Sequence, residues 1–149
     1  MSEQSGAGSG VPSVASALTV ATPDVVPVVR YADARAAVQF LTDAFGFTTS
    51  QVHDGPDGTV AHAELVWAGG MVMLGTAGQG SVLPEKTGPS VVYVVVDDPD
   101  AHHERAVAAG AEVLQGLTDQ EYGSREYTAR DPEGNIWSFG TYRPAPVAG

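Results

Sequence analysis

The sequence contains no cysteine and only one lysine, Lys86, among its 149 residues. Without cysteine the chain has no disulfide, no thiol nucleophile and no thiolate metal site. Acidic residues outnumber basic residues 18 to 7, which gives a formal net charge of −11. Nucleic acids and anionic membrane surfaces are bound through basic patches, so we expect neither as a partner. A cationic ligand is compatible with this balance, although net charge does not place charge in a pocket.

Long apolar runs are also missing. No segment approaches the roughly 18 apolar residues that a membrane-spanning helix requires. The first 22 residues lack the basic start of a secretory signal, and Pro23 follows closely after their short apolar patch. These absences predict a cytoplasmic protein. Hydrophobic residues make up 43% of the sequence, and a chain of this length forms one domain with a substantial core.

The strongest feature that is present is an internal repeat with a spacing of 64 residues. A helix-like stretch begins at Asp33 and stops at Gly46, and a second begins at Asp97 and stops at Gly110. In each half a later glycine precedes a short apolar run, and the pattern of both halves is strand, helix, then three strands. A unit of this size usually needs its copy to bury an apolar face. We therefore predict an α+β fold of two βαβββ modules with a cleft between them.

Composition divides the chain into five parts. The small, polar residues at the start predict a flexible tail, because they bury too little apolar surface to offset their ordering entropy. The predicted parts are a tail at 1–23, module one at 24–77, a linker at 78–88, module two at 89–143 and a tail at 144–149. The predicted strands are 25–31, 47–53, 60–67, 71–76, 91–96, 112–117, 125–130 and 136–142.

Two stretches resemble the vicinal oxygen chelate superfamily, and most closely its glyoxalase/bleomycin-resistance branch. The stretch at 33–47 contains the helix and the Phe-Gly-Phe that ends it, and the stretch at 125–137 contains Asp-Pro-Glu-Gly-Asn. The resemblance extends over roughly residues 25–143. It implies paired βαβββ modules whose curved mixed sheets curl partly around a cavity, usually in a homodimer. It is much less specific for activity, since one fold hosts many chemistries.

The resemblance also implies four metal-ligand positions, which the enzymes of the family fill with His, Gln or Glu. In this sequence they fall at Val26, or at Pro27 with a slip of one residue, and at Leu74, Val91 and Ser138. Divalent metals need imidazole nitrogens or carboxylate oxygens, which these side chains do not carry. We therefore expect no metal at these positions and no cofactor.

The same strands supply the candidate ligand-binding residues. Tyr93 lies two positions after Val91 and so shares its face, where it can stack on a ligand and donate a hydrogen bond; core packing is the alternative. Ser138 can bind a ligand or fill a narrow cavity. Trp67 is either core under the helix or a platform at the cavity edge. The predicted apolar lining consists of Val26, Val28, Leu74 and Val91.

Other polar residues have two interpretations each. His62 and Glu64 share a strand face and can form a relocated divalent metal site or an acid/base couple; a solvated strand face or a salt bridge across a dimer seam is the alternative. Arg125 can hold a carboxylate or phosphate, or form a plain ion pair. His102 and His103 are adjacent on a helix and point in different directions, so they cannot form an i, i+4 metal pair, and both are predicted on the surface.

These observations lead to three functional hypotheses. The first is a metal-free protein that binds an aromatic or amphipathic small molecule, antibiotic sequestration being one such role. The second is a lyase, isomerase or dioxygenase that uses a metal at the non-standard ligands His62 and Glu64. The third is a scaffold with a vestigial cleft. No residue is assigned as catalytic, and a homodimer is expected because open, curved sheets have strand edges that need covering.

Overall fold

The computed structural model describes residues 23–78 and 89–145, which form two mixed four-stranded sheets. The first module comprises β2 (Val28–Tyr31), α3 (Ala34–Phe45), β3 (Thr48–Asp54), the 3₁₀ turn η1 (Pro56–Gly58), β4 (Val60–Trp67) and β5 (Gly70–Thr76). The second comprises β6 (Val91–Val95), α4 (Pro99–Ala108), β7 (Glu112–Asp119), β8 (Arg125–Arg130) and β9 (Ile136–Gly140). This arrangement confirms the predicted α+β fold of two βαβββ modules.

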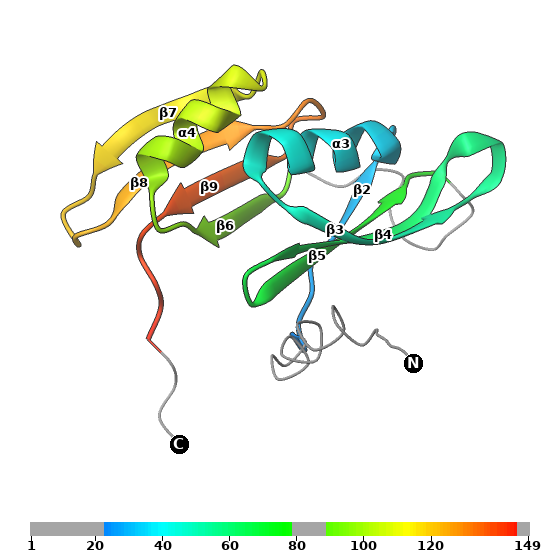
Figure 1. Ribbon diagram of the computed structural model, residues 1–149, viewed down its shortest axis with the longest axis horizontal. Helices are drawn as coiled ribbons and strands as arrows, with labels where there is room; N and C mark the ends of the chain where they lie inside the picture. Colours follow the sequence, from blue (N-terminus) through cyan, green and yellow to red (C-terminus); the bar gives the residue numbers. More distant parts are fainter. Residues whose placement is uncertain (1–22, 79–88, 146–149) are drawn as a thin grey trace, which may run out of the picture.

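Both sheets have the same topology. The strand orders are β2-β5-β4-β3 and β6-β9-β8-β7. The first pair of each order is parallel and the other pairs are antiparallel. Both helices lie on the same side of the two sheets, so each sheet has a face covered by its helix and an opposite face, here called the open face (Figure 1).

Several predicted segments fall largely outside the described residues. The predicted tail at 1–23 and linker at 78–88 lie outside them except for Pro23 and Gly78, and the predicted tail at 144–149 is described only as far as residue 145. Within the described parts of the chain, no helix is long and apolar enough to cross a membrane.

Caps set the bounds of the helices. The carboxylate of Asp33 accepts a hydrogen bond of 3.0 Å from a backbone amide in the first turn of α3, and Gly46, with φ of 83°, ends this helix in the left-handed conformation. The second helix begins at Pro99, and its N-cap is Asp98 rather than Asp97. The repeat therefore shifts by one residue at this point.

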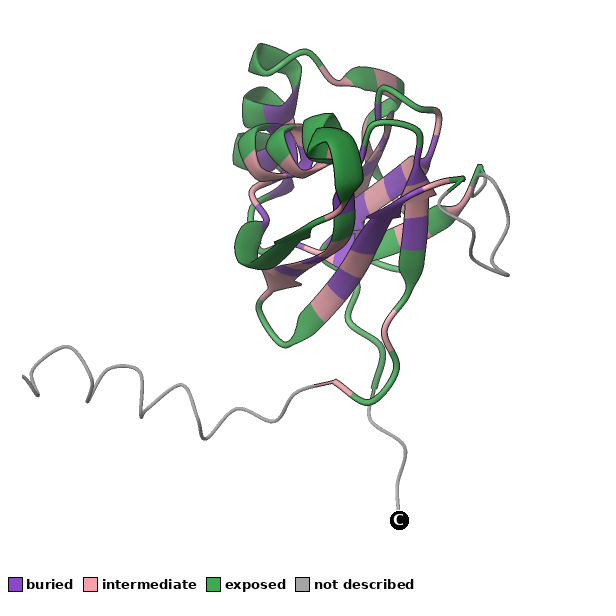
Figure 2. Ribbon diagram, turned by 90° about the vertical axis from the view of Figure 1, so that its right-hand side faces the viewer, coloured by how far each residue is buried: buried purple, intermediate pink, exposed green. Residues whose placement is uncertain are grey.

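Side chains alternate between the two faces of each sheet, and Figure 2 shows the resulting stripes of buried and less buried residues along the strands. Leu74 is 1% exposed and belongs to the core, so the prediction that it lines an open cavity is wrong. Its neighbour Met73 occupies the other face, opposite Val28 on one side and Glu64 on the other. Because strand side chains alternate, an error of one residue moves a position to the opposite face.

A buried carboxylate joins the two modules. Asp131, in the Asp-Pro-Glu-Gly-Asn turn, accepts hydrogen bonds from Tyr31 Oη at 2.6 Å and from Trp137 Nε1 at 3.1 Å. In the same turn, the carboxylate of Glu133 accepts from the two backbone amides that immediately precede α3, at 2.7 and 2.9 Å. The turn that carries the family resemblance thus holds module two against the first strand and helix of module one.

The helices are joined by His102, which the sequence placed wrongly on the surface. Its Nε2 donates to the carbonyl oxygen of Phe45 at 2.8 Å, so Nδ1 accepts from Tyr127 Oη at 2.6 Å. Burial lowers the pKa of His102, which favours this neutral form. Arg105 donates to two further carbonyls in the last turns of α3, and His103 is half-buried against Tyr127. One face of α4 therefore packs against α3.

Candidate functional site

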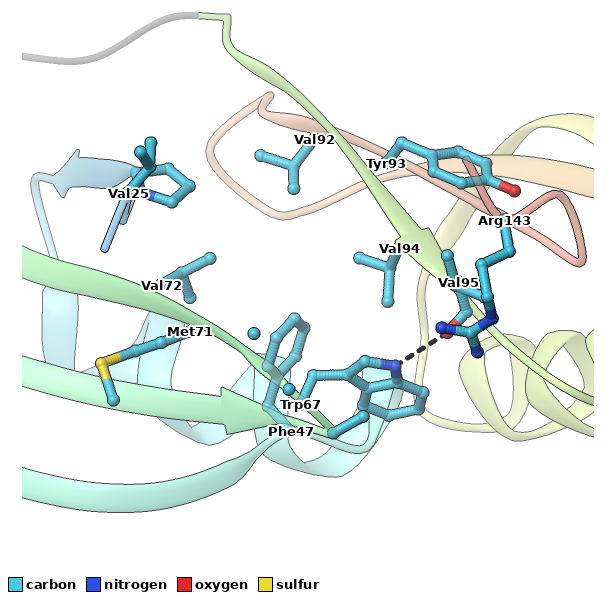
Figure 3. A pocket seen from close by; sticks show the side chains of 14 residues that line it. Val25, Phe47, Trp67, Met71, Val72, Val92, Tyr93, Val94, Val95 and Arg143 are labelled. Atoms are coloured by element: carbon cyan, nitrogen blue, oxygen red, sulfur yellow. Dashed lines mark hydrogen bonds between the residues drawn. The ribbon is translucent and has the colours of Figure 1, made fainter. Parts of the chain in front are cut away.

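A cavity of about 500 Å³ lies where the β4–β5 hairpin of module one meets β6 of module two. Figure 3 shows its apolar wall, to which both modules contribute. The main apolar side chains are Phe47, Trp67, Val72, Val92 and Val94. The site exists because two modules are packed side by side, and neither module forms it alone.

Trp67 is held in one orientation at this wall. Its indole Nε1 donates a hydrogen bond of 2.8 Å to the carbonyl oxygen of Val95, across the junction of the modules. The indole ring also packs against Phe47, at a centroid distance of 5.7 Å, and against His102 at 5.6 Å. Trp67 therefore combines the two roles that the sequence left open, because it packs on buried rings and also lines the cavity. A fixed aromatic wall is well suited to a planar ligand.

Arg143 is a polar residue at the edge of the same cavity, and Tyr93 borders it from β6 with its ring on the opposite face of the strand from Val92 and Val94 (Figure 3). The hydroxyl of Tyr93 donates to the carbonyl oxygen of Tyr142 at 2.8 Å. Burial raises the pKa of Tyr93, so the phenol is protonated at neutral pH. Arg143 follows the last strand, and nothing in the sequence pattern pointed to it. Phe47 was equally missed, although the Phe-Gly-Phe motif that contains it was a usable signal.

The open face of module two carries three of the predicted ligand-binding residues. Tyr93 is the direct cross-strand neighbour of Ser138, whose Oγ lies 3.2 Å from Thr128 Oγ1. Val91, at the start of β6, is 68% exposed. Of these three residues, Tyr93 lines the cavity between the modules. The role of Ser138 and Val91 in ligand binding stays a prediction.

The open face of module one carries a separate group of predicted residues. His62 Nε2 lies 2.8 Å from Glu64 Oε2, and both side chains are partly exposed. Met73 separates Glu64 from Val28, and the half-buried Val26 precedes this strand. Across residues 23–78 and 89–145, no group of three or more His, Asp or Glu side chains is arranged to hold a metal ion. His62 and Glu64 thus form a pair away from the cavity between the modules.

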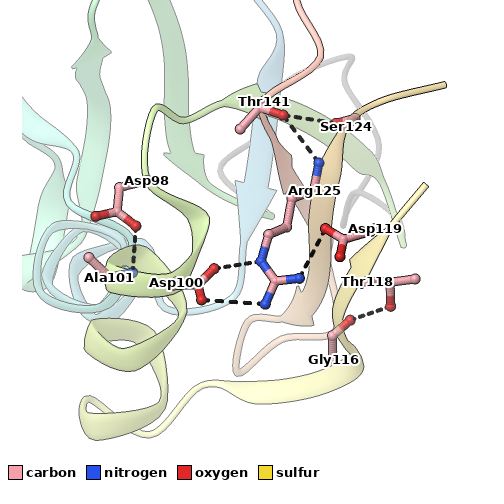
Figure 4. A network of polar contacts seen from close by, with 9 residues as sticks. All are labelled: Asp98, Asp100, Ala101, Gly116, Thr118, Asp119, Ser124, Arg125 and Thr141. Atoms are coloured by element: carbon pink, nitrogen blue, oxygen red, sulfur yellow. Dashed lines mark hydrogen bonds and ion pairs between the residues drawn. The ribbon is translucent and has the colours of Figure 1, made fainter. Parts of the chain in front are cut away.

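Arg125 is used in ion pairs instead of facing the open side. Its guanidinium donates to Asp100 of α4 at 2.7 Å and to Asp119 of β7 at 3.0 Å (Figure 4). The hydrogen bonding of Arg125 to Asp100 lowers the pKa of the Asp100 carboxyl. Because Arg125 reaches α4, its strand neighbour Glu126 projects to the open face. This is the ion-pair alternative that the sequence left open for Arg125.

The sequence profile of the Glyoxalase/Bleomycin resistance protein/Dioxygenase superfamily matches residues 24–139. The chain belongs to this superfamily. It is 36% identical over 125 residues to the uncharacterized protein Rv0887c of Mycobacterium tuberculosis, a match that covers 79% of this chain and 74% of that protein. Among solved structures, TioX from Micromonospora sp. ML1 is 36% identical with a TM-score of 0.69, covering 79% of this chain and 97% of TioX.

A second solved structure shares the fold at lower identity. A glyoxalase/bleomycin resistance protein/dioxygenase from Nocardioides is 22% identical with a TM-score of 0.60, and the match covers 95% of this chain and all of that chain. Its likeness supports the paired βαβββ architecture of the superfamily and carries no argument about activity.

The metal-ligand positions that the superfamily resemblance implied do not fit a divalent metal here. On β5 the residue on the open face is Met73, because Leu74 is in the core. The other positions hold Val26, Val91 and Ser138. Valine, methionine and serine provide neither imidazole nor carboxylate, the usual ligands of zinc, iron and manganese in proteins.

Proposed function

We propose that this superfamily member binds an aromatic or amphipathic small molecule in the cavity between its modules and holds it without changing it chemically. Antibiotic sequestration is the biological role that we propose for such binding. The observation that carries the proposal is the cavity of about 500 Å³ with Trp67 and Phe47 fixed in its wall. Drug-sized ligands occupy cavities of this size, which are lined mainly by apolar and aromatic side chains.

The geometry favours a planar ring with a polar substituent. A ring stacked on Trp67 would bury roughly 100 Å² of apolar surface, worth about 2.5 kcal/mol at about 25 cal/mol per Å². This corresponds to roughly a 70-fold change in dissociation constant. The guanidinium of Arg143 supplies donors at the same cavity, so a ligand with a carbonyl, phenolate or carboxylate oxygen fits best.

Binding can be measured by calorimetry and by quenching of tryptophan fluorescence with a panel of planar and glycopeptide antibiotics. We expect a member of the panel to bind at micromolar concentration, and Trp67→Ala to weaken that binding about 70-fold. Trp67→Phe keeps an aromatic wall and should restore part of the affinity. If no compound binds, or if Trp67→Ala has no effect on binding, the proposal is wrong.

A cavity-filling variant gives an independent check. Val92→Phe adds volume inside the cavity, whereas Val107→Phe makes the same change on α4 at a residue that is 48% exposed. Only Val92→Phe should abolish binding, with both variants folded by circular dichroism. Mass spectrometry of the recovered ligand should show it unchanged. A modified ligand would mean that the protein is an enzyme.

The pair His62 and Glu64 supports a second candidate, a lyase, isomerase or dioxygenase with a divalent metal at this place. An imidazole nitrogen and a carboxylate oxygen 2.8 Å apart are suitable partners for a shared metal if a further ligand completes the site. Elemental analysis of the purified protein tests this candidate. Stoichiometric zinc, iron, manganese or nickel that is lost in His62→Ala would favour it over sequestration.

We also propose that a second copy of the chain covers Val28 and Val91 on the open faces. Val28 is 43% exposed and Val91 is 68% exposed there, although both are large apolar residues. Light scattering at micromolar concentration should then give about twice the chain mass of 15.3 kDa. A mass equal to one chain would exclude this dimer, and Val91→Glu should shift a genuine dimer toward monomer.

A further inference from the structure

A second cavity, of about 510 Å³, lies on the open face of module two and is walled by three tyrosines and one carboxylate. Its lining residues are Tyr93, Tyr122, Glu126, Tyr142 and Pro144. The tyrosines come from three different segments, namely β6, the turn between β7 and β8, and the segment after β9. The fold thus gathers aromatic rings around one acidic side chain.

Hydrogen bonds hold the walls of this tyrosine cavity in place. Tyr122 Oη donates to Glu126 Oε1 at 2.9 Å, and Tyr93 Oη donates to the carbonyl oxygen of Tyr142 at 2.8 Å. The rings of Tyr122 and Tyr142 meet at 87° with centroids 5.9 Å apart. The backbone amide of Tyr142 is in turn bound to Ser124 Oγ at 2.9 Å. The cavity is therefore built from interlocked side chains.

The absence of a side chain at Gly140 makes room for this arrangement. Gly140 is the cross-strand neighbour of Glu126, and a Cβ atom there would lie 2.5 Å from Glu126 Cγ and 2.8 Å from Tyr93 Oη. Real Cβ atoms do not approach other atoms so closely. Glycine at this position lets the carboxylate and the phenol lie over the strand together.

The charge of the tyrosine cavity is negative. The hydrogen bond to Glu126 raises the pKa of Tyr122, and burial raises the pKa of Tyr93, so both phenols stay neutral at pH 7. The guanidinium of Arg125, adjacent in sequence to Glu126, is bound to Asp100 on the helix side of the sheet. A carboxylate edged by aromatic rings attracts cations through its own charge and through the negative faces of the rings.

We propose that the tyrosine cavity binds an alkylammonium group, such as a quaternary or methylated amine, with Glu126 as its counter-charge. Rings from Tyr93, Tyr122 and Tyr142 replace part of the water around the methyl groups, and the carboxylate balances the charge. The site goes beyond the proposed sequestration, because its ligand is recognised by charge and it lies outside the cavity at Trp67. Tyr93 borders both cavities, so a ligand with an aromatic body and a cationic arm is able to use both.

The test compares choline with 3,3-dimethylbutan-1-ol, a neutral molecule of the same shape, by NMR titration of the full chain. We expect choline to bind at millimolar concentration, at least about ten-fold more tightly than the neutral alcohol, and to shift the tyrosine resonances rather than the Trp67 indole signal. Equal affinities for the two molecules, or shifts centred on Trp67, would overturn the proposal.

Two variants distinguish binding at the tyrosine cavity from the general attraction of a cation to this acidic protein. Glu126→Gln removes the charge but keeps an oxygen that can accept from Tyr122, and it should weaken choline binding about ten-fold while leaving the neutral alcohol unaffected. Glu121→Gln removes the same charge from a nearby exposed residue and should have little effect. If both variants weaken choline binding equally, long-range electrostatic attraction explains the binding and the proposed site is wrong.

A second variant covers the case in which Glu126→Gln alters the fold. Tyr122 is 61% exposed, so Tyr122→Leu keeps apolar bulk at an accessible place and removes the aromatic face. It should weaken choline binding roughly three- to thirty-fold, the range expected for a cation on an aromatic ring. Unchanged choline binding in this variant would refute the role of the rings. Neither result depends on whether an antibiotic binds at Trp67.

Discussion

Replacing His102 with leucine removes two hydrogen bonds at the junction of α4 and α3. In the protein, His102 bonds to the carbonyl oxygen of Phe45 and to the hydroxyl of Tyr127 at 2.8 and 2.6 Å. Leucine has similar bulk and no polar atom, so both former partners would lose their hydrogen bonds to the ring. The perturbation thus acts on buried polar groups more than on packing volume.

The expected cost follows from those two groups. A buried donor or acceptor without a partner costs about 1–3 kcal/mol. The hydroxyl of Tyr127 has a partial substitute, since it also lies 3.4 Å from the backbone carbonyl oxygen of His102. We therefore expect His102→Leu to lower the free energy of unfolding by about 2–4 kcal/mol. Domains of this kind have total stabilities of about 5–15 kcal/mol, so the loss is easily measured.

Urea unfolding at pH 7.5, followed by circular dichroism, is the appropriate assay. His103→Leu is the matched control, because it changes the same residue type at the next position of α4, where the ring is half-buried and contacts Tyr127 edge-on. The control should cost less than about 1 kcal/mol. A loss below about 1 kcal/mol in His102→Leu, or equal losses in the two variants, would refute the inference that His102 joins the helices.

Three further outcomes are expected. Burial lowers the pKa of His102, so as the pH falls its imidazole is protonated in the unfolded chain before it is protonated in the folded protein. His102 therefore contributes its full stabilisation above about pH 6.5 and less below it. The urea midpoints at pH 7.5 and 5.5 should differ less in His102→Leu than in the parent protein. Asp131→Asn places an amide group against hydrogen-bond donors that include Tyr31 and Trp137. It should lower the free energy of unfolding by about 2–4 kcal/mol in the same assay. An unchanged stability would contradict the inference that the buried carboxylate of Asp131 joins the two modules. Asp33→Ala removes the N-cap of α3 and should cost about 1 kcal/mol in urea unfolding, with Asp33→Asn near the parent; an equal loss in both would exclude capping as the cause.

The local structure of the chain was largely predictable from the sequence. Capping by Asp33, the glycine stop at Gly46 and the alternation of apolar residues along the strands depend on neighbours in the chain, so their signals are local. The internal repeat and the Asp-Pro-Glu-Gly-Asn turn led to the correct superfamily and to two βαβββ modules.

The candidate sites required the tertiary structure. His102 and His103 are adjacent on one helix, and only the packing of α4 against α3 decides which of them is buried. Leu74 and Met73 differ by one position on a strand, which is enough to exchange core and open face. Both cavities collect side chains from segments far apart in the chain, whose meeting depends on how whole elements pack. The sequence by itself therefore determined the elements and their family, because these follow from local patterns, while packing between elements decided the burial of His102 and the place of each cavity.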